Sequence, residues 1–370
     1  MKYYTDKFKY VIKIVLIIAM LISNIRCIKV YSIEEQAEDT SEIAEAVKDI
    51  FKNRNDAIIT KDLELIKSIY DLKTKYGTWA FEYERKKLQY IINWEQRQGV
   101  KFIEIKPNLV IRRIRKRSDN KYSINLLNST EYKYIYEDRP EEINTFRIGT
   151  HHTLQLMNEG GFLVITKEWY KDPFADSLDA DNSKKEAVKQ YILSQERRDF
   201  SAIPARRMNA MEYAYKYCGA ASEEKDGYKY NRKYRNYNYM GGDCANFASQ
   251  ILFEGGKFRK NSAWNYDKSG ATGAWVNADR FKNYMLNSGR ASLIAYGSYD
   301  RVYKASYKLL PGDFVAYEKK GDVTHISTVS SADSRGYSLV TCHNTDRKDV
   351  PWDLGWSNRK IRFWLVHVHY

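Results

Sequence analysis

The sequence is short of proline and cysteine, with 6 Pro and 4 Cys in 370 residues. Hydrophobic residues make up 43% of the chain and charged residues 29%, which is typical of folded protein and excludes a proline-rich or highly charged disordered chain. No internal repeat or low-complexity tract is visible in the sequence, so a repeat architecture is not expected. At this length we expect about two folded domains.

A long hydrophobic run is also missing. The apolar stretch from Ile14 to Ile25 is shorter than the ~20 residues that a helix needs to cross a bilayer. It follows several lysines and precedes small or β-branched residues that end at Ser32, which is typical of a secretory signal peptide. We therefore predict that residues 1–32 are cleaved and that the mature protein is secreted or associated with the cell wall. The alternative is an uncleaved anchor, which would be the protein's one membrane contact.

Three cysteines remain after this cleavage, namely Cys218, Cys244 and Cys342. An odd number of cysteines in an oxidising compartment leaves at least one thiol unpaired. Catalysis is one reason to keep a free thiol outside the cell. The sequence does not decide whether Cys218 and Cys342 form a disulfide.

Charge of one sign is in excess only in the C-terminal half, where residues 204–370 carry 26 basic and 16 acidic side chains. This excess favours a polyanion, and for an exported protein the obvious one is an anionic polymer of the cell wall; the same charge would also keep the protein soluble. The basic run from Arg112 to Arg117 is interrupted by Ile114 and lies in a neutral region. We therefore expect a solvated strand face there and no nucleic-acid partner.

The N-terminal half reads as helices followed by strands. Apolar residues recur at helical spacing over residues 34–53 and 62–98, and Gly99 stops the second run. A meander of strands is predicted over residues 101–106, 109–117, 122–127, 131–136, 144–157 and 162–171. This α+β order resembles the cone-shaped NTF2-like or cystatin-like domains, in which helices cover a curved antiparallel sheet.

The string Gly241-Gly242-Asp243-Cys244 is the most informative in the chain. The two glycines allow a tight turn, and small or apolar residues then recur at helical spacing until Gly255. A cysteine at a helix start is expected to have a lowered pKa, because free N–H groups stabilise its thiolate, and the same groups can bind an oxyanion. Asp243 is expected to be the N-cap. By itself, such a cysteine is more often a small buried hydrophobe.

A base for this thiol is predicted on a downstream strand. Residues 324–330 follow a Pro-Gly-Asp turn and a first strand, and His325 stands at their start. A cysteine on a helix followed by a histidine on a strand is the papain order. The next strand, residues 337–345, holds His343 and Asn344, either of which could orient His325. Since neighbours on a strand face opposite ways, only one of them can do so.

The C-terminal half resembles the "putative amidase" domain family of secreted Gram-positive proteins. The resemblance lies in a series of motifs in chain order: Gly-Gly-Asp-Cys before Asn-Phe-Ala-Ser-Gln, then Ala-Trp, Pro-Gly-Asp, Thr-His-Ile and His-x-x-Asp. That family is akin to the NlpC-type and CHAP cell-wall hydrolases, which have a papain-like fold. The resemblance covers roughly residues 205–370. It implies that Cys244 is the nucleophile, His325 the base and His343 the third residue, whereas a papain-like or CHAP-like site would use Asn344. Ala245 stands where the family pattern has Thr.

The predicted organisation is a signal peptide (1–32), an α+β accessory domain (33–175), a linker (176–203) and a papain-like amidase domain (204–370). The resemblance implies a secreted cysteine amidase or peptidase that cleaves an amide bond, in cell-wall peptide, through a thioester and without a metal or cofactor. One alternative is a protease or small-amide hydrolase that acts on another substrate. The other is a wall-binding module with an idle catalytic centre.

Overall fold

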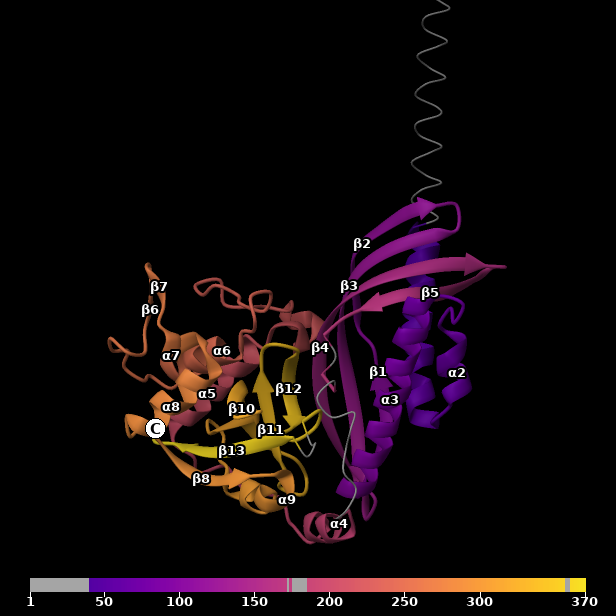
Figure 1. Cartoon of the computed structure of the whole chain (residues 1–370). Helices are drawn as coiled ribbons and strands as arrows, with labels where there is room; N and C mark the ends of the chain where they lie inside the picture. Colours follow the sequence, from indigo (N-terminus) through magenta and orange to yellow (C-terminus); the bar gives the residue numbers. More distant parts are fainter. Residues whose placement is uncertain (1–39, 172, 175–184, 357–359) are drawn as a thin grey trace, which may run out of the picture. The chain divides into compact units, whose positions relative to one another are not determined.

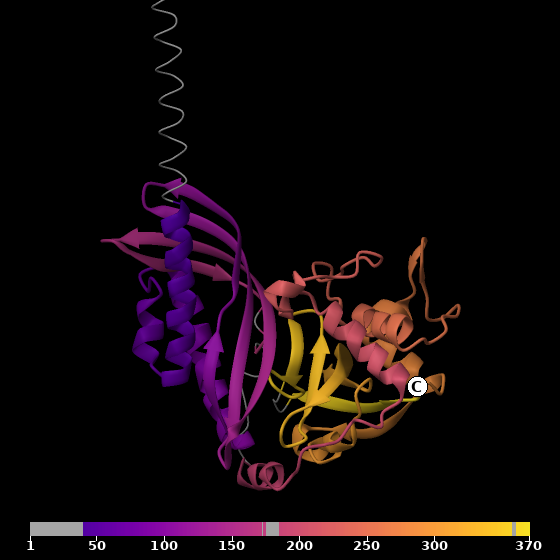
Figure 2. The same cartoon turned by 180° about the vertical axis from the view of Figure 1, so that it is seen from behind.

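The computed structural model describes residues 40–171, 173–174, 185–356 and 360–370 (Figures 1 and 2). The predicted signal peptide and the first part of the predicted linker lie outside these ranges. Within them, no helix has both the length and the apolar character that a membrane span requires. The chain divides into two compact units, residues 1–50 and 51–370, and the elements labelled below all belong to the second unit.

Residues 40–60 are helical, and they are followed by α2 (Leu63–Ser68) and α3 (Lys75–Gln98). The prediction of one helix over residues 62–98 is therefore wrong. The chain leaves the helix between α2 and α3 because its backbone pairs with a strand there: the N–H of Asp71 donates to the carbonyl of Ile165, and the N–H of Ile165 donates to the carbonyl of Ile69. The hydroxyl of Thr74 then accepts from the N–H of Gly77 and starts α3.

Five antiparallel strands follow, and α3 packs against the first and the last of them (Figure 1). They are β1 (Val100–Lys106), β2 (Leu109–Ser118), β3 (Lys121–Tyr136), β4 (Arg139–Glu159) and β5 (Phe162–Trp169). The two strands predicted over residues 122–127 and 131–136 are one strand, β3. It stays continuous because its pairing with β4 extends from Lys121 opposite Met157 to Tyr136 opposite Arg139.

The C-terminal region adds further helices and a second run of antiparallel strands. The helices are α4 (Lys185–Leu193), α5 (Ala205–Lys216), α6 (Cys244–Gln250), α7 (Gly273–Val276), α8 (Ala278–Asn287) and α9 (Tyr299–Val302). The strands are β8 (Ala291–Gly297), β9 (Phe314–Lys319), β10 (Asp322–Ala332), β11 (Ser338–Cys342), β12 (Asp346–Pro351) and β13 (Ile361–Val368). A small hairpin joins β6 (Tyr266–Asp267) to β7 (Gly270–Ala271).

The strand order in this region is β12-β11-β10-β9-β13-β8, and β12 also pairs with β4, so one sheet runs through both regions. Buried side chains from α6, α7 and α8 form an apolar core with β9, β10 and β13, in which Trp275, Phe281 and Ile326 are fully buried. The predicted α+β class is confirmed. The predicted domain boundaries stay a prediction.

Candidate active site

Cys244 begins α6 directly after a turn that only glycine accommodates well. Gly241 and Gly242 have φ values of 104° and 134°, in the region that L side chains rarely adopt. A Cβ atom at Gly242 would also lie 2.8 Å from the side-chain nitrogen of Asn344. Helix α6 continues as a π-helical turn up to Gly255. The turn and the helix that starts at Cys244 are therefore as predicted.

The electrostatics of Cys244 differ from the prediction. The side chain is 6% exposed, and its burial raises the pKa of the thiol to about 11, although hydrogen bonds from the backbone of Ile326 and Ala245 act to lower it. The expected lowering is wrong because the loss of solvent outweighs the two N–H groups that face the sulfur. In this structure Cys244 is a neutral thiol at pH 7.

His325 lies on β10 next to Ile326, the residue whose backbone hydrogen-bonds to Cys244. Its ring is 2% exposed and stacks on Trp356, with 4.9 Å between ring centroids. Burial, reinforced by the positive charges of Arg347 and Lys171, holds the pKa of His325 well below its ordinary value. The imidazole is therefore neutral at pH 7, as a general base must be.

The recorded partner of His325 is Cys342, whose sulfur lies 3.3 Å from Nε2. Among the described residues, the structure records no hydrogen bond between Cys244 and His325 and none to Nδ1 of His325. Cys342 also lies close enough to Cys244 for the two sulfurs to interact electrostatically. The structure thus brings the predicted nucleophile and base into one neighbourhood and adds a second thiol to it.

His343 does not orient His325. Its Nδ1 lies 2.6 Å from Oδ2 of Asp243, its Nε2 lies 2.7 Å from the carbonyl oxygen of Tyr217, and its ring stacks on Phe247 at 3.7 Å. Burial alone would lower the pKa of His343, but the hydrogen bond to Asp243 and the negative charges nearby raise it above the ordinary value. Both ring nitrogens are engaged elsewhere, so the assignment of His343 as the third residue is corrected to a structural role.

Asn344 does not contact His325 either, since its Oδ1 accepts a hydrogen bond from Nζ of Lys171. Cys342 contacts His325 instead, two residues earlier on the chain. The predicted strand over residues 337–345 would have put Cys342 and Asn344 on one face, but β11 ends at Cys342, and Asn344 lies in the following turn with a φ of 73°. Nothing else in the sequence pointed to Cys342, because a buried cysteine is usually a core residue.

Asp243 is not the side-chain N-cap that was predicted, because its side chain makes no capping hydrogen bond. Its Oδ1 accepts from the backbone N–H of Tyr237 and from the side-chain amide of Asn246, and its Oδ2 pairs with His343. A buried imidazolium attracts a carboxylate more strongly than a backbone N–H does. Asp243 therefore ties the turn before Cys244 to the end of β11.

An open cavity of about 700 Å³ borders His325. Its lining from the C-terminal region includes Gly241, Thr324, Asn344 and Trp356. The opposite lining comes from α3 and from the end of β5, as detailed below.

Cys218, Cys244 and Cys342 are all free thiols in the structure, so the Cys218–Cys342 disulfide left open above is not formed here. The described part of the chain contains no group of three or more His, Cys, Asp or Glu residues that could hold a metal ion.

The C-terminal region thus has a buried cysteine at the start of α6 and a buried, neutral histidine on β10, a strand that α6 packs against. Residues 205–366 match the model of a family described as "Putative amidase domain". This match supports an amidase or hydrolase function for the C-terminal region. No curated protein matches the chain.

Two solved structures resemble part of the chain. The intermembrane space region of the chloroplast protein ARC6 shares 9% identity and has a TM-score of 0.25, with 34% of this chain and 95% of that chain covered. An NTF-2 like protein of unknown function from Shewanella oneidensis MR-1 shares 13% identity and has a TM-score of 0.22, with coverages of 35% and 98%. Both scores are too low to support an argument about structure or function.

Proposed function

We propose that this protein is a cysteine amidase in which Cys244 is the nucleophile and His325 the general base. The proposal rests on the family match to an amidase domain together with a neutral, buried His325 that lines an open cavity and stands next to Ile326, whose backbone hydrogen-bonds to Cys244. The amide substrate would lie in this cavity, with its carbonyl carbon at the sulfur of Cys244.

The reaction follows from the protonation states. The thiol is neutral, so Cys244 transfers its proton to His325 as the sulfur attacks the carbonyl carbon. The resulting oxyanion collapses, the C–N bond breaks, and His325 returns the proton to the leaving amine. Water then hydrolyses the thioester and restores the thiol. Because Nε2 contacts Cys342, Nδ1 is the nitrogen that would accept the proton of Cys244.

We propose cell-wall peptide as the substrate and the cell exterior as the place of action. Two sequence features support this: the signal-peptide pattern of residues 1–32 and the basic excess of the C-terminal half, which suits anionic wall polymers. Purified Gram-positive wall incubated with the protein should release free amines. A protein that binds the wall and releases none would be a wall-binding module instead.

The proposed export also predicts where the mature chain begins. We expect protein recovered from culture supernatant and wall fractions to begin near Ile33, because the apolar run is too short to anchor the chain. Mass spectrometry of the N-terminal peptide measures this. An intact N-terminus recovered from the membrane fraction would show that the segment is an anchor.

The raised pKa of Cys244 predicts slow labelling at neutral pH. Iodoacetamide reacts with the thiolate, so labelling of folded protein should accelerate as pH rises toward the pKa of about 11. Labelling is followed by peptide mass spectrometry of Cys244, with the similarly buried Cys218, whose pKa burial raises to about 12, as the internal comparison. A labelling midpoint below the ~8.5 of an ordinary cysteine would instead support a thiolate activated by the helix start.

The contact between Cys342 and His325 predicts that Cys342 is a positioning residue. Cys342→Ala removes the only hydrogen-bond partner of Nε2 among the described residues and should lower kcat by about fivefold, since a buried hydrogen bond contributes about 1 kcal/mol. Cys342→Ser keeps a hydroxyl at the same place and should retain most of the activity. A merely structural role would leave the pH dependence of kcat/KM unchanged, whereas a positioning role should shift its acidic limb in Cys342→Ala.

A further inference from the structure

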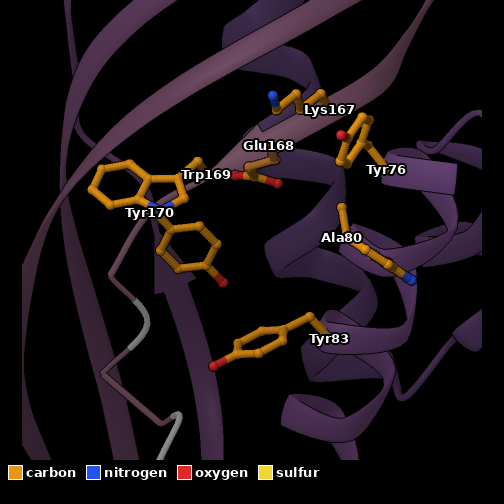
Figure 3. A pocket seen from close by; sticks show the side chains of 8 residues that line it. Tyr76, Ala80, Tyr83, Lys167, Glu168, Trp169 and Tyr170 are labelled. Carbon is orange, nitrogen blue, oxygen red and sulfur yellow. The ribbon is translucent and has the colours of Figure 1, made fainter.

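A second cavity, of about 370 Å³, lies between α3 and the end of β5 (Figure 3). Aromatic side chains dominate its lining. They are Tyr76, Trp79 and Tyr83 from α3, and Trp169 and Tyr170 from the end of β5. Nothing in the proposed reaction uses these residues directly.

Three of these aromatic rings are unusually open to solvent. Tyr76 is 51% exposed, Trp79 is 56% exposed and Trp169 is 64% exposed. Tyr76 and Trp79 hold each other edge to face, with 5.6 Å between ring centroids, so their positions are fixed. Large aromatic surfaces gathered at one hollow of a soluble protein are typical of a binding site.

The charge at this cavity is positive. Lys167 lines it, with its ammonium 4.7 Å from the ring centre of Tyr76. Glu168 also lines the cavity, but its carboxylate is buried in an ion pair with Arg54 at 2.9 Å and also binds His152 at 2.8 Å. Its negative charge is therefore balanced by Arg54 inside the protein, whereas the ammonium of Lys167 is available to a ligand.

This cavity adjoins the one that borders His325, because Tyr83, Trp169 and Tyr170 line both of them. Beyond them, Lys171 lines the larger cavity and binds Asn344 near the turn that precedes Cys244.

We propose that the aromatic cavity is a second subsite, which binds the part of an acidic peptide substrate that lies away from the cleaved bond. The aromatic faces hold apolar side chains and backbone of the peptide, and Lys167 pairs with a carboxylate. A neutral oligosaccharide would leave the lysine without a partner, so the charge favours the peptide. The inference rests on the proposed function for the identity of the neighbouring catalytic site.

Equilibrium binding to the full chain carrying Cys244→Ala tests the subsite without hydrolysis. The probes are the stem peptides released from purified Gram-positive wall, the same peptides with their carboxylates converted to amides, and neutral glycan fragments of that wall. By calorimetry, the acidic peptides should bind best. Adding Trp79→Ala or Lys167→Gln should weaken their binding about tenfold each, as expected for central contacts of an interface.

Phe162→Ala is the matched control, since Phe162 is a 77% exposed aromatic residue on the same strand, β5, and lines neither cavity. Its affinity should stay within twofold of the parent. Unchanged affinity in both Trp79→Ala and Lys167→Gln, stronger binding of the glycan fragments, or no binding of the acidic peptides would each overturn the subsite. Wall hydrolysis by the native chain together with any of these results would leave the proposed function standing. Binding of the acidic peptides without wall hydrolysis by the native chain would overturn the proposed function and leave the subsite in place.

Discussion

Replacing Cys244 with alanine should reduce release of amines from purified wall by roughly 10⁴-fold or more, because loss of a nucleophile removes the covalent pathway entirely. The side chain is small and buried at the start of α6, so the variant should keep its fold, which circular dichroism can verify. His325→Ala should cause a loss of similar size. Combining the two should cost little more than either, because they act as a unit.

The matched control for this experiment is Cys218→Ala. Cys218 is also a free, buried thiol, its side chain bonds to the carbonyl of Tyr215, and it lines neither cavity described above. Its replacement should leave turnover unchanged. If Cys218→Ala abolished activity while Cys244→Ala retained it, the assignment of the nucleophile would be wrong.

The second large effect concerns stability. His343→Ala should lower the free energy of unfolding by about 3–5 kcal/mol, because it leaves the buried carboxylate of Asp243 without its cationic partner. Urea unfolding monitored by circular dichroism measures this. His369→Ala, which removes an exposed imidazole, serves as the control and should change stability by less than about 0.5 kcal/mol.

The same pair makes the stability depend on pH. The pKa of His343 is raised in the folded protein, so the pair contributes fully below the ordinary histidine pKa of about 6.5. This contribution is lost as the pH rises through the raised pKa of the folded state. The difference in stability between the native protein and His343→Ala should therefore shrink in alkaline solution. A loss of turnover without a loss of stability would instead return His343 to the catalytic role expected from the family pattern.

Local sequence patterns were enough to predict most of the secondary structure. The Gly241-Gly242 turn, the helix from Cys244 and the strand that carries His325 depend on backbone preferences and periodicity, which are properties of neighbouring residues. The errors lie where contacts between distant segments of the chain determine the secondary structure. The break before α3 depends on pairing with Ile165, and the continuity of β3 depends on the whole length of β4.

The order of motifs was enough to predict that Cys244 begins a helix and that His325 lies on a downstream strand, and the structure places both in one neighbourhood. The partner of His325 could not be predicted, because it depends on which of several side chains near the end of β11 reaches its ring. The pKa of Cys244 could not be predicted, because desolvation depends on the packing of α6 against β10 and not on the sequence around the thiol. The part of the cavity lining that comes from α3 and β5 could not be predicted either, because its residues lie far from the amidase motifs in the sequence.

The central claim is that the amide is cleaved through a thioester on Cys244. Acid-quenched reactions with cell-wall peptide, analysed by peptide mass spectrometry, test it most directly. The account predicts an acyl adduct on the Cys244 peptide that appears during turnover, disappears with alkaline hydroxylamine and is absent from Cys244→Ala. Amine release at the native rate by Cys244→Ala, with no adduct on any cysteine of the native protein, would contradict the account.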